Sequence, residues 1–476
     1  MPSPQSSTLY EQVAGKIEQL IRSGALRPGD RVPSVRRACI QHGVSLTTAV
    51  QAYLSLENRG LIEARPKSGF FVRSQVRDRL LEPAVSRVVS SPKRVGVGNL
   101  QARIFDAARL PEVIPFGAAY PGAANLPVKK LSLIMASVAR SAGAQGINYD
   151  MPPGSERLRR QIARRSLDWG GNLSPDEIIT TCGGTEALGL CLRAVTKAGD
   201  IVAVESPAYF GMLQQIEALG LKALEIPMHP RTGMNLDALE RALKNRRIAA
   251  CLAVPNFSNP LGSLMPEENK QRLLELLARR DVPLIEDDIN GDLSHAGVRP
   301  RVVHSYDKAG RVLLCGSFSK TLAPGYRVGW VAPGRFYEQV KSLKLTSTLA
   351  TSSLPQLAIA EFMANGGYDH HLRSLRHNFA TQIKQMSDAV AEAFPAEIKI
   401  TRPEGGFVLW IELPKKVSSL KLHELALNEK ISIAPGPMFS ATQNFQNFIR
   451  LNCGHPWSAG FERAIDTLGR LVKKLM

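Results

Sequence analysis

One stretch indicates the fold of this chain: Gly316-Ser317-Phe318-Ser319-Lys320-Thr321-Leu322-Ala323-Pro324-Gly325-Tyr326-Arg327. It follows an apolar run, residues 312–314, that predicts a strand, so the lysine lies in a Ser- and Gly-rich turn at a strand end. Taken alone, such a lysine can simply be a solvated loop residue. An amine among hydroxyl donors, followed by an arginine, is also the set of groups that a Schiff base to a phosphate-bearing aldehyde requires.

Two further stretches supply what such a ligand would need. Residues 284–288 read as an apolar strand that ends in carboxylates, and a carboxylate there can pair with a protonated pyridine nitrogen. The alternative for this stretch is a helix cap or a surface pair. Cys182-Gly183-Gly184-Thr185 is a Gly-rich turn that opens a helix, and its free N–H groups would form an anion site. The three stretches occurring in one chain favour a cofactor site.

Apolar runs alternate with helical patterns from residue 149 onward. The runs 201–204, 249–254 and 284–286 read as strands, and 185–197 and 266–280 between them read as helices. This alternation predicts an α/β domain with a mostly parallel sheet.

Together these stretches resemble the fold-type I aminotransferases, which use pyridoxal phosphate, over about residues 113–476. The resemblance implies that Lys320 is the Schiff-base lysine and that Asp287 pairs with the pyridine nitrogen. It also implies that Arg450, in Phe448-Ile449-Arg450-Leu451-Asn452, holds a substrate α-carboxylate. The other implied cofactor contacts are the phosphate ligands Ser317, Ser319, Arg327, Gly184 and Thr185, the ring contacts Asn259 and Tyr209, and Tyr149, which would reach the phosphate of a neighbouring subunit.

One departure from this family concerns the chemistry. Members commonly place a tyrosine two or three residues after the pyridine aspartate, where this chain has Ile289 and Asn290. Asn290 can still donate a hydrogen bond, but it cannot act as a phenol. We therefore expect that cofactor binding is retained while the electronics of the bound cofactor, and with them efficient turnover, change.

The N-terminal residues form a second pattern. Helical spacing over residues 9–21, 34–41 and 46–58, with Ser34 and Ser45 as caps, is followed by two short strands, 61–64 and 70–72, around a basic turn. This order predicts a winged helix-turn-helix whose third helix fits a major groove. A small, solvated basic domain is the alternative. The predicted DNA contacts are Arg36, Ser45, Thr47, Thr48, Gln51, Arg65, Lys67 and Gly69.

This module resembles the GntR family of bacterial regulators. Residues 28–36, 43–50, 58–62 and 68–72 carry the resemblance, which covers nearly all of residues 8–73. The family often has an arginine after the Ser of the turn, where it touches DNA, and this chain has Leu46. Leu46 could contact a thymine methyl instead.

Composition and charge set the outer limits. The chain has 476 residues and a net charge of +18, of which +5 belongs to residues 1–73. Its length predicts more than one domain, and the basic balance indicates a polyanionic partner. There is no run of about 20 apolar residues and no signal-peptide pattern. The six cysteines are dispersed and the histidines form no metal-binding spacing, so we expect a cytoplasmic protein without a metal site.

We expect an N-terminal winged helix-turn-helix domain at 1–73, a linker at 74–112 and an aminotransferase-like domain at 113–476. Its large subdomain would span about 145–345, and the small subdomain would come from the remainder. This architecture resembles the MocR subfamily of GntR regulators. The resemblance implies a dimeric, pyridoxal-phosphate-dependent transcriptional regulator that binds paired DNA half-sites.

Its effector would be an amine, an amino acid or a B6 vitamer. The effector would displace Lys320 to form an external aldimine and would thereby close the pocket. A working aminotransferase that carries a DNA-binding module is the alternative function.

Overall fold

The computed structural model describes residues 8–23, 25–26, 29–65, 68–72, 80–86, 91–96 and 100–476. The chain forms two compact units, Met1–Leu80 and Leu81–Met476. No helix of the described residues combines the length and the apolar composition that crossing a membrane requires.

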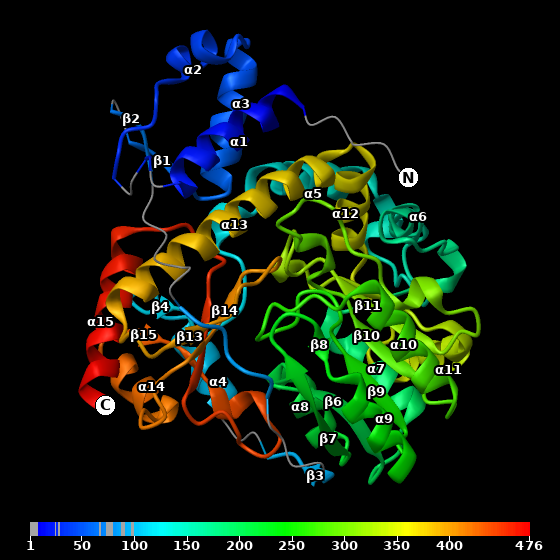
Figure 1. Ribbon diagram of the computed structural model, residues 1–476. Helices are drawn as coiled ribbons and strands as arrows, with labels where there is room; N and C mark the ends of the chain where they lie inside the picture. Colours follow the sequence, from blue (N-terminus) through cyan, green and yellow to red (C-terminus); the bar gives the residue numbers. More distant parts are fainter. Residues whose placement is uncertain are drawn as a thin grey trace, which may run out of the picture. The chain divides into compact units, whose positions relative to one another are not determined.

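The first unit consists of three helices and a two-stranded antiparallel sheet (Figure 1): α1 (Leu9–Arg22), α2 (Val35–His42), α3 (Leu46–Asn58), β1 (Ile62–Arg65) and β2 (Gly69–Val72). The oxygen of Ser34 accepts a hydrogen bond from the Arg37 N–H at 3.2 Å and starts α2, and the oxygen of Ser45 accepts one from the Thr48 N–H at 3.1 Å and starts α3. The predicted winged helix-turn-helix order is confirmed, with strand boundaries that differ by one residue.

Helix α3 has one face buried in the core of the first unit and one exposed face. Ala49, Ala52, Tyr53 and Leu56 are fully buried and pack against α1 and α2. The Tyr53 hydroxyl donates to the carbonyl oxygen of Pro33, and burial raises the pKa of this hydroxyl to about 12. The opposite face of α3 is exposed because its residues follow the helical repeat away from the core.

A nine-stranded sheet forms the centre of the second unit, in the order β3-β7-β6-β9-β10-β11-β12-β5 with β8 beside β7. The inner strands β7, β6, β9, β10 and β11 run parallel, and their residues are almost all buried because helices cover both faces. The strands are β3 (Lys93–Arg94), β5 (Ile179–Thr181), β6 (Ile201–Ser206), β7 (Lys222–His229), β8 (Gly233–Met234), β9 (Ala250–Ala253), β10 (Leu284–Asp287), β11 (Val312–Ser317) and β12 (Gly329–Ala332).

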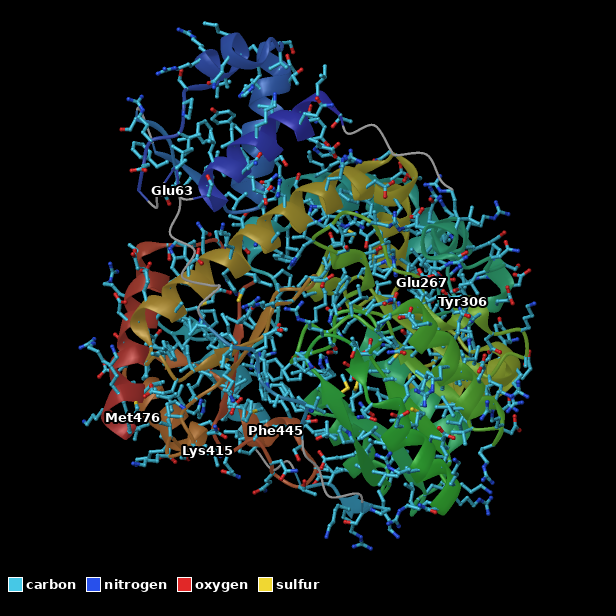
Figure 2. The ribbon with its side chains drawn as sticks, viewed as in Figure 1. Glu63, Glu267, Tyr306, Lys415, Phe445 and Met476 are labelled. Atoms are coloured by element: carbon cyan, nitrogen blue, oxygen red, sulfur yellow. The ribbon has the colours of Figure 1, made fainter. Side chains whose placement is uncertain are left out.

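Two apolar clusters fill the space on the two faces of this sheet. One contains leucines of α9 (Leu236–Asn245) and α10 (Glu267–Ala278), and the other contains residues of α7 (Gly184–Val195) and α8 (Phe210–Ala218). Helix α11 (Tyr337–Ser347) packs on α7. Figure 2 shows side chains along these helices, and near the start of α10 the Tyr306 hydroxyl donates to Glu267 at 2.9 Å. The α/β fold with a mostly parallel sheet is thus confirmed.

A smaller, antiparallel sheet follows in the order β13-β14-β17-β16. Its strands are β13 (Lys399–Ile400), β14 (Val408–Glu412), β17 (Phe448–Asn452) and β16 (Ala434–Pro435), and a separate pair joins β15 (Ile431–Ser432) to β4 (Ile114–Pro115). The long helix α13 (Gly367–Ala393) packs on α15 (Ala459–Leu475), as Figure 1 shows, and α14 (Ser419–Asn428) also contacts α15. Helices α5 (Val128–Ser141), α6 (Glu156–Ser166) and α12 (Ser353–Ala364) pack together at the other end of α13.

The segment expected to be a linker, residues 74–112, differs from that expectation where it is described. Strand β3 pairs with β7 at the sheet edge, and Ile104 of helix α4 (Leu100–Ala107) is fully buried. Residues 81–86, 91–96 and 100–112 therefore belong to the second unit. The reason is that β7 offers a free edge and that α4 presents apolar side chains to the core.

Candidate cofactor site and DNA-binding surface

The candidate cofactor site lies where the parallel strands of the large sheet end. Strands β10 and β11 run parallel and lead directly to Asp287 and to the turn that holds Lys320, and β6 and β9 end beside them. Carboxyl ends of parallel strands meet at one sheet edge, which is where α/β proteins bind ligands. The residues that line the pocket are Ala119, Tyr209, Val254, Asn259, Asp287, Ile289, Asn290, Lys320, Gly406, Phe407 and Val408.

Lys320 and Asp287 share this pocket, and their environment favours the uncharged form of each. Burial, helped by the nearby Arg450 charge, lowers the pKa of Lys320 to about 8, and the Lys320 ammonium donates to the carbonyl oxygen of Ala119. Burial raises the pKa of Asp287 to about 7, although the Ile289 N–H donates to its carboxylate at 3.2 Å. A lysine with a lowered pKa is a better nucleophile at neutral pH.

Helix α7 begins with Gly184, and the N–H groups in the first turn of a helix have no partner within the helix. Gly183 precedes it with a φ of 82°, and a Cβ there would lie 2.4 Å from Nη2 of Arg327. Glycine is therefore required both for the backbone conformation and for the close approach of the guanidinium. Arg327 in turn donates to the Ser319 hydroxyl at 3.2 Å and to the carbonyl oxygen of Cys182 at 3.3 Å.

The hydroxyls of Ser317 and Ser319 complete this group of donors. Ser317 donates to Ser319 at 3.0 Å, and the Ser319 N–H donates back to the Ser317 oxygen at 3.1 Å. Two hydroxyls, a guanidinium and the N-terminus of α7 form a cluster of donors without a carboxylate among these contacts, which suits a phosphate. The structure thus brings together the predicted residues Ser317, Ser319 and Arg327 with the first turn of α7.

Asn290 lies in the pocket but has a structural task. Its amide donates to the carbonyl oxygen of Phe257 at 2.9 Å, and it is 8% exposed. One of its two N–H groups is therefore engaged, and one remains for a ligand. Phe257 has a φ of 56°, so this hydrogen bond holds a backbone conformation that is uncommon for a bulky residue.

Arg450 is completely buried beside the pocket, on strand β17. Its guanidinium donates to the carbonyl oxygen of Gly117 and to the Asn259 oxygen at 3.4 Å, while its buried Nε has no hydrogen-bond partner. Burial lowers the pKa of Arg450 to about 10. In the described residues no carboxylate pairs with this guanidinium, although buried cations normally have such a partner. A ligand carboxylate would supply it.

Tyr149 is not part of this assembly within one chain. Its side chain is 75% exposed, and it precedes Asp150 in an irregular segment. Its predicted role concerns a neighbouring subunit and stays a prediction.

Sequence reasoning missed several contributors to the site. The carbonyl groups of Ala119 and Gly117 accept from Lys320 and Arg450, and no side-chain pattern could have indicated them. Glu205 at the end of β6 is also buried; burial, together with the Asp287 charge, raises its pKa to about 8. A carboxylate that directly follows the apolar run 201–204 could have indicated Glu205 as a site residue from the sequence.

A buried ionic network supports the strand end that carries Asp287. Asp288 accepts hydrogen bonds from Arg299 and, at 2.8 Å, from the Asn256 amide, and Lys270 donates to Asn256 at 2.7 Å. Because each of these charges is paired or hydrogen-bonded, the network holds the loop after β10 in one arrangement.

The cofactor-free Asp287→Asn protein should show a weaker dependence of stability on pH than the wild type. A carboxyl whose folded-state pKa is raised contributes stability below its unfolded pKa, 3.8, and this contribution is lost as the pH rises through about 7. The difference in the free energy of unfolding between pH 4 and pH 8 should shrink by on the order of 3 kcal/mol. Urea unfolding at several pH values measures it, with the exposed Asp466→Asn on α15 as control. Equal pH slopes in the wild type and the Asp287 variant would contradict the placement of this carboxyl.

The exposed face of α3 and the start of α2 form the candidate DNA surface. Arg36, Thr47 and Gln51 are exposed, Thr48 is half-buried, and the side chain of Leu46 is 58% exposed. The Ser45 oxygen accepts from the Thr48 N–H, so its role in the structure is to cap the helix.

The wing of this unit is described in part. Gly69 is exposed with a φ of 97° and begins β2 opposite Arg65. Lys67 and the Arg65 side chain lie outside the described residues, so their roles as DNA contacts stay predictions.

Both units are similar to known protein families. Residues 9–72 match the bacterial regulatory proteins of the gntR family, and residues 119–468 match aminotransferase class I and II. The uncharacterized HTH-type transcriptional regulator YdcR of Escherichia coli is 39% identical, over 98% of this chain and 99% of its own length. The 2-aminoadipate transaminase of Thermus thermophilus is 30% identical over 80% of this chain and 96% of its own length.

Among solved structures, the multiple substrate aminotransferase of Thermococcus profundus matches with a TM-score of 0.74 at 26% identity, over 80% of this chain and 96% of its own. The two units therefore define a transcriptional regulator in which a winged helix-turn-helix is fused to a fold-type I aminotransferase domain. The chain belongs to the GntR family of regulators, in its MocR subfamily.

Pyridoxal phosphate is the cofactor of this class, and the residues present fit it. The buried Asp287 offers a carboxylate to a pyridinium, the donor cluster at α7 suits a phosphate, and Lys320 offers an amine in the same pocket as Asp287.

Proposed function

We propose that this DNA-binding regulator holds pyridoxal phosphate at Lys320 and senses an amino acid, another amine or a B6 vitamer in the same pocket. The observation that carries the proposal is Arg450, a buried guanidinium without a carboxylate partner in the described residues, next to the pocket that contains Lys320. An α-amino acid presents an amine and a carboxylate together, which matches Lys320 and Arg450 as a pair.

Each part of the cofactor has a residue of this pocket that would contact it. Pyridoxal phosphate, when bound, supplies an aldehyde that condenses with primary amines. Asp287 would hold its ring nitrogen, Asn259 and the remaining Asn290 N–H would contact its ring oxygen, and Tyr209 would cover its face. Lys320 would hold it until an effector amine takes the place of the Lys320 amine.

Regulation requires that the effector binds two arrangements of the protein with different affinity. A ligand that binds both arrangements equally well leaves the equilibrium between them unchanged. We propose a homodimer in the cytoplasm, in which the exposed Tyr149 reaches the phosphate site of the other subunit. Two winged helices would then read two half-sites on the DNA.

Transamination is the second candidate function. Lys320, Asp287 and Arg450 are the groups that this reaction uses, and all three lie at one site. Asn290 stands where the family commonly has a tyrosine, and one of its N–H groups is engaged by Phe257. Steady conversion of an amino acid and an oxo acid at about 1 per second or faster would make this the primary function.

A thermal-shift screen of the cofactor-loaded protein tests the sensing proposal. Free amino acids, simple amines and B6 vitamers are added one at a time, since any ligand of the folded state raises the melting temperature by mass action. At least one compound should stabilise the protein and change its affinity for DNA. A compound that stabilises without changing DNA affinity would contradict regulation through this pocket.

Arg36→Ala should weaken DNA binding by about threefold to tenfold and reduce the dependence of affinity on salt by about one ion. Arg36 is exposed at the start of α2, where helix-turn-helix proteins approach the DNA backbone. Fluorescence anisotropy at several salt concentrations measures both quantities. The control is Arg246→Ala, in the second unit. Unchanged DNA binding by the Arg36 variant would contradict the assignment of Arg36 to the DNA-binding surface.

A further inference from the structure

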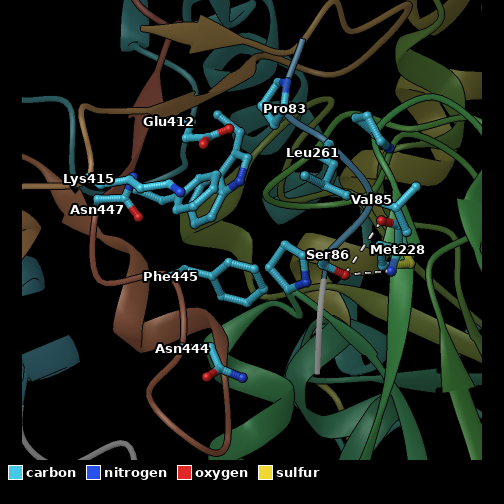
Figure 3. A pocket seen from close by; sticks show the side chains of 15 residues that line it. Pro83, Val85, Ser86, Met228, Leu261, Glu412, Lys415, Asn444, Phe445 and Asn447 are labelled. Atoms are coloured by element: carbon cyan, nitrogen blue, oxygen red, sulfur yellow. Dashed lines mark hydrogen bonds between the residues drawn. The ribbon is translucent and has the colours of Figure 1, made fainter. Parts of the chain in front are cut away.

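A cavity of about 430 Å³ lies in the second unit, apart from the pocket around Lys320. The two share no lining residue. Its volume falls within the range of small-molecule sites. Figure 3 shows Lys415, Phe445 and Asn447 on one side of this cavity and Val85, Ser86 and Met228 on the other.

One wall is formed by residues 81–86, which we name the strap. Its first residue is tied to the small sheet, because the Ile400 N–H donates to the carbonyl oxygen of Leu81 at 3.0 Å. Its last residue is tied to the large sheet: the Ser86 N–H donates to the Met228 oxygen at 3.0 Å, and the Met228 N–H donates to the Ser86 hydroxyl oxygen at 2.8 Å. The strap thus bridges the two sheets over the cavity, directly after the end of the first unit at Leu80.

The opposite wall is aromatic. The rings of Trp410 and Phe448 stack at 5.4 Å between centroids, and Phe445 meets both of them edge to face. Phe445 has a φ of 63°, a backbone conformation that costs a bulky residue free energy and is found where the surrounding structure enforces it. This conformation brings the Phe445 ring to the cavity (Figure 3). A wall of flat rings favours a flat apolar ligand.

The charge at the cavity is positive. Glu412 is neutralised by Lys399, with 3.0 Å between the carboxylate and the ammonium. Lys415 is exposed at the cavity, close to Phe445 in Figure 2, and in the described part of the chain it has no ion-pair partner. Asn444 and Asn447 add amide groups at the same side. One cation without a partner beside aromatic rings suits a ligand with a single anionic group.

We propose that this cavity is a second ligand site, distinct from the cofactor pocket, and that it binds a small aromatic carboxylate. The ring would lie against Phe445 and Trp410, and the carboxylate would face Lys415. Because the strap forms the other wall, a bound ligand would hold residues 81–86 in place, and these residues lead to the DNA-binding unit.

The test uses the full chain saturated with pyridoxal phosphate and the dye 8-anilinonaphthalene-1-sulfonate, an aromatic anion that fluoresces in apolar sites. Binding should be saturable. Benzoate should displace the dye, and benzamidine, a cation of similar size, should not. Lys415→Met should weaken dye binding about threefold and Phe445→Ala about tenfold, while Lys416→Met, which changes the exposed neighbour outside the cavity, should leave it unchanged.

Hydrogen exchange distinguishes binding in the cavity from adsorption of the dye to the protein surface, because surface adsorption would not change the exchange rates of the strap. Amide exchange in residues 81–86 should slow when benzoate is present, and the visible spectrum of the cofactor should not change. No saturable binding, equal binding by the Lys415→Met protein and the wild type, displacement by benzamidine, or unaltered exchange in the strap would each overturn the proposal. Because Lys415 is exposed, its variant leaves the core intact and keeps the test valid if Phe445→Ala fails to fold.

Discussion

The Lys320→Ala protein is expected to lose the visible absorption band that pyridoxal phosphate shows when it is bound to a lysine. Lys320 is the lysine that lines the pocket with Asp287, and its lowered pKa, about 8, keeps part of its amine uncharged and nucleophilic near neutral pH. Asp287 and the donor cluster at α7 remain in the variant, so weak, non-covalent cofactor binding should persist. Absorption spectra before and after dialysis measure both effects.

Lys341→Ala provides the matched control, because Lys341 lies on α11 with a 4.0 Å ion pair to Glu338 and a contact with the Tyr337 ring at 5.8 Å, both of which are weak surface interactions. It should keep the full absorption band. Reduction with borohydride followed by mass spectrometry should place the cofactor on Lys320 in the wild type and in this control. A band that survives in Lys320→Ala, or a label on another lysine, would refute the assignment of Lys320.

The Arg450→Met protein is expected to lose its response to amino acids, by about 100-fold in affinity, while its response to amines without a carboxylate is unchanged. Met fills a similar volume but offers no charge to a ligand carboxylate. Methionine removes a desolvated charge, but it also leaves the Gly117 carbonyl and the Asn259 oxygen without this donor, so the melting temperature of the ligand-free variant is the baseline for each response.

Thermal shifts with an amino acid and with its decarboxylated amine measure this difference on the cofactor-loaded protein. Arg450→Lys is the second variant, and it should restore only part of the response because an ammonium cannot make two parallel hydrogen bonds to a carboxylate. An equal loss for the amino acid and the amine would show that Arg450 acts on the pocket as a whole. An unchanged response to the amino acid would rule out its carboxylate role.

Much of the fold could be predicted because its signals are local. Ser34 and Ser45 stand at helix starts where a hydroxyl accepts from a free N–H, and both caps are found there. The apolar runs that became β6, β9, β10 and β11 are continuous because these strands are buried on both faces. Motif spacing likewise indicated Lys320, Asp287 and Arg327; Lys320 and Asp287 line one pocket, and Arg327 donates to Ser319.

Other features depended on partners far away in the chain. Asn290 was expected to face the cofactor, and its amide donates to the carbonyl oxygen of Phe257, 33 residues earlier. Residues 81–86, 91–96 and 100–112 carry Pro, Gly and Ser among few periodic apolar positions, as linkers do, yet they belong to the second unit: β3 pairs with the free edge of β7, and α4 buries Ile104 in the core. A free strand edge is a property of the assembled sheet and leaves no pattern in the segment that binds it.

The sequence by itself determined the two modules, their order and the helix caps, and it predicted Lys320 as the reactive lysine, because these follow from short-range spacing and side-chain chemistry. Only the tertiary structure decided that Ala119 and Gly117 accept from Lys320 and Arg450, that Arg450 is buried without a carboxylate in the described residues, and that residues 81–86 close a cavity. Every residue has the same backbone carbonyl, so no sequence pattern indicates which carbonyl accepts a hydrogen bond. The burial of Arg450 and the cavity arise when distant elements pack together, and they too leave no local pattern in the sequence.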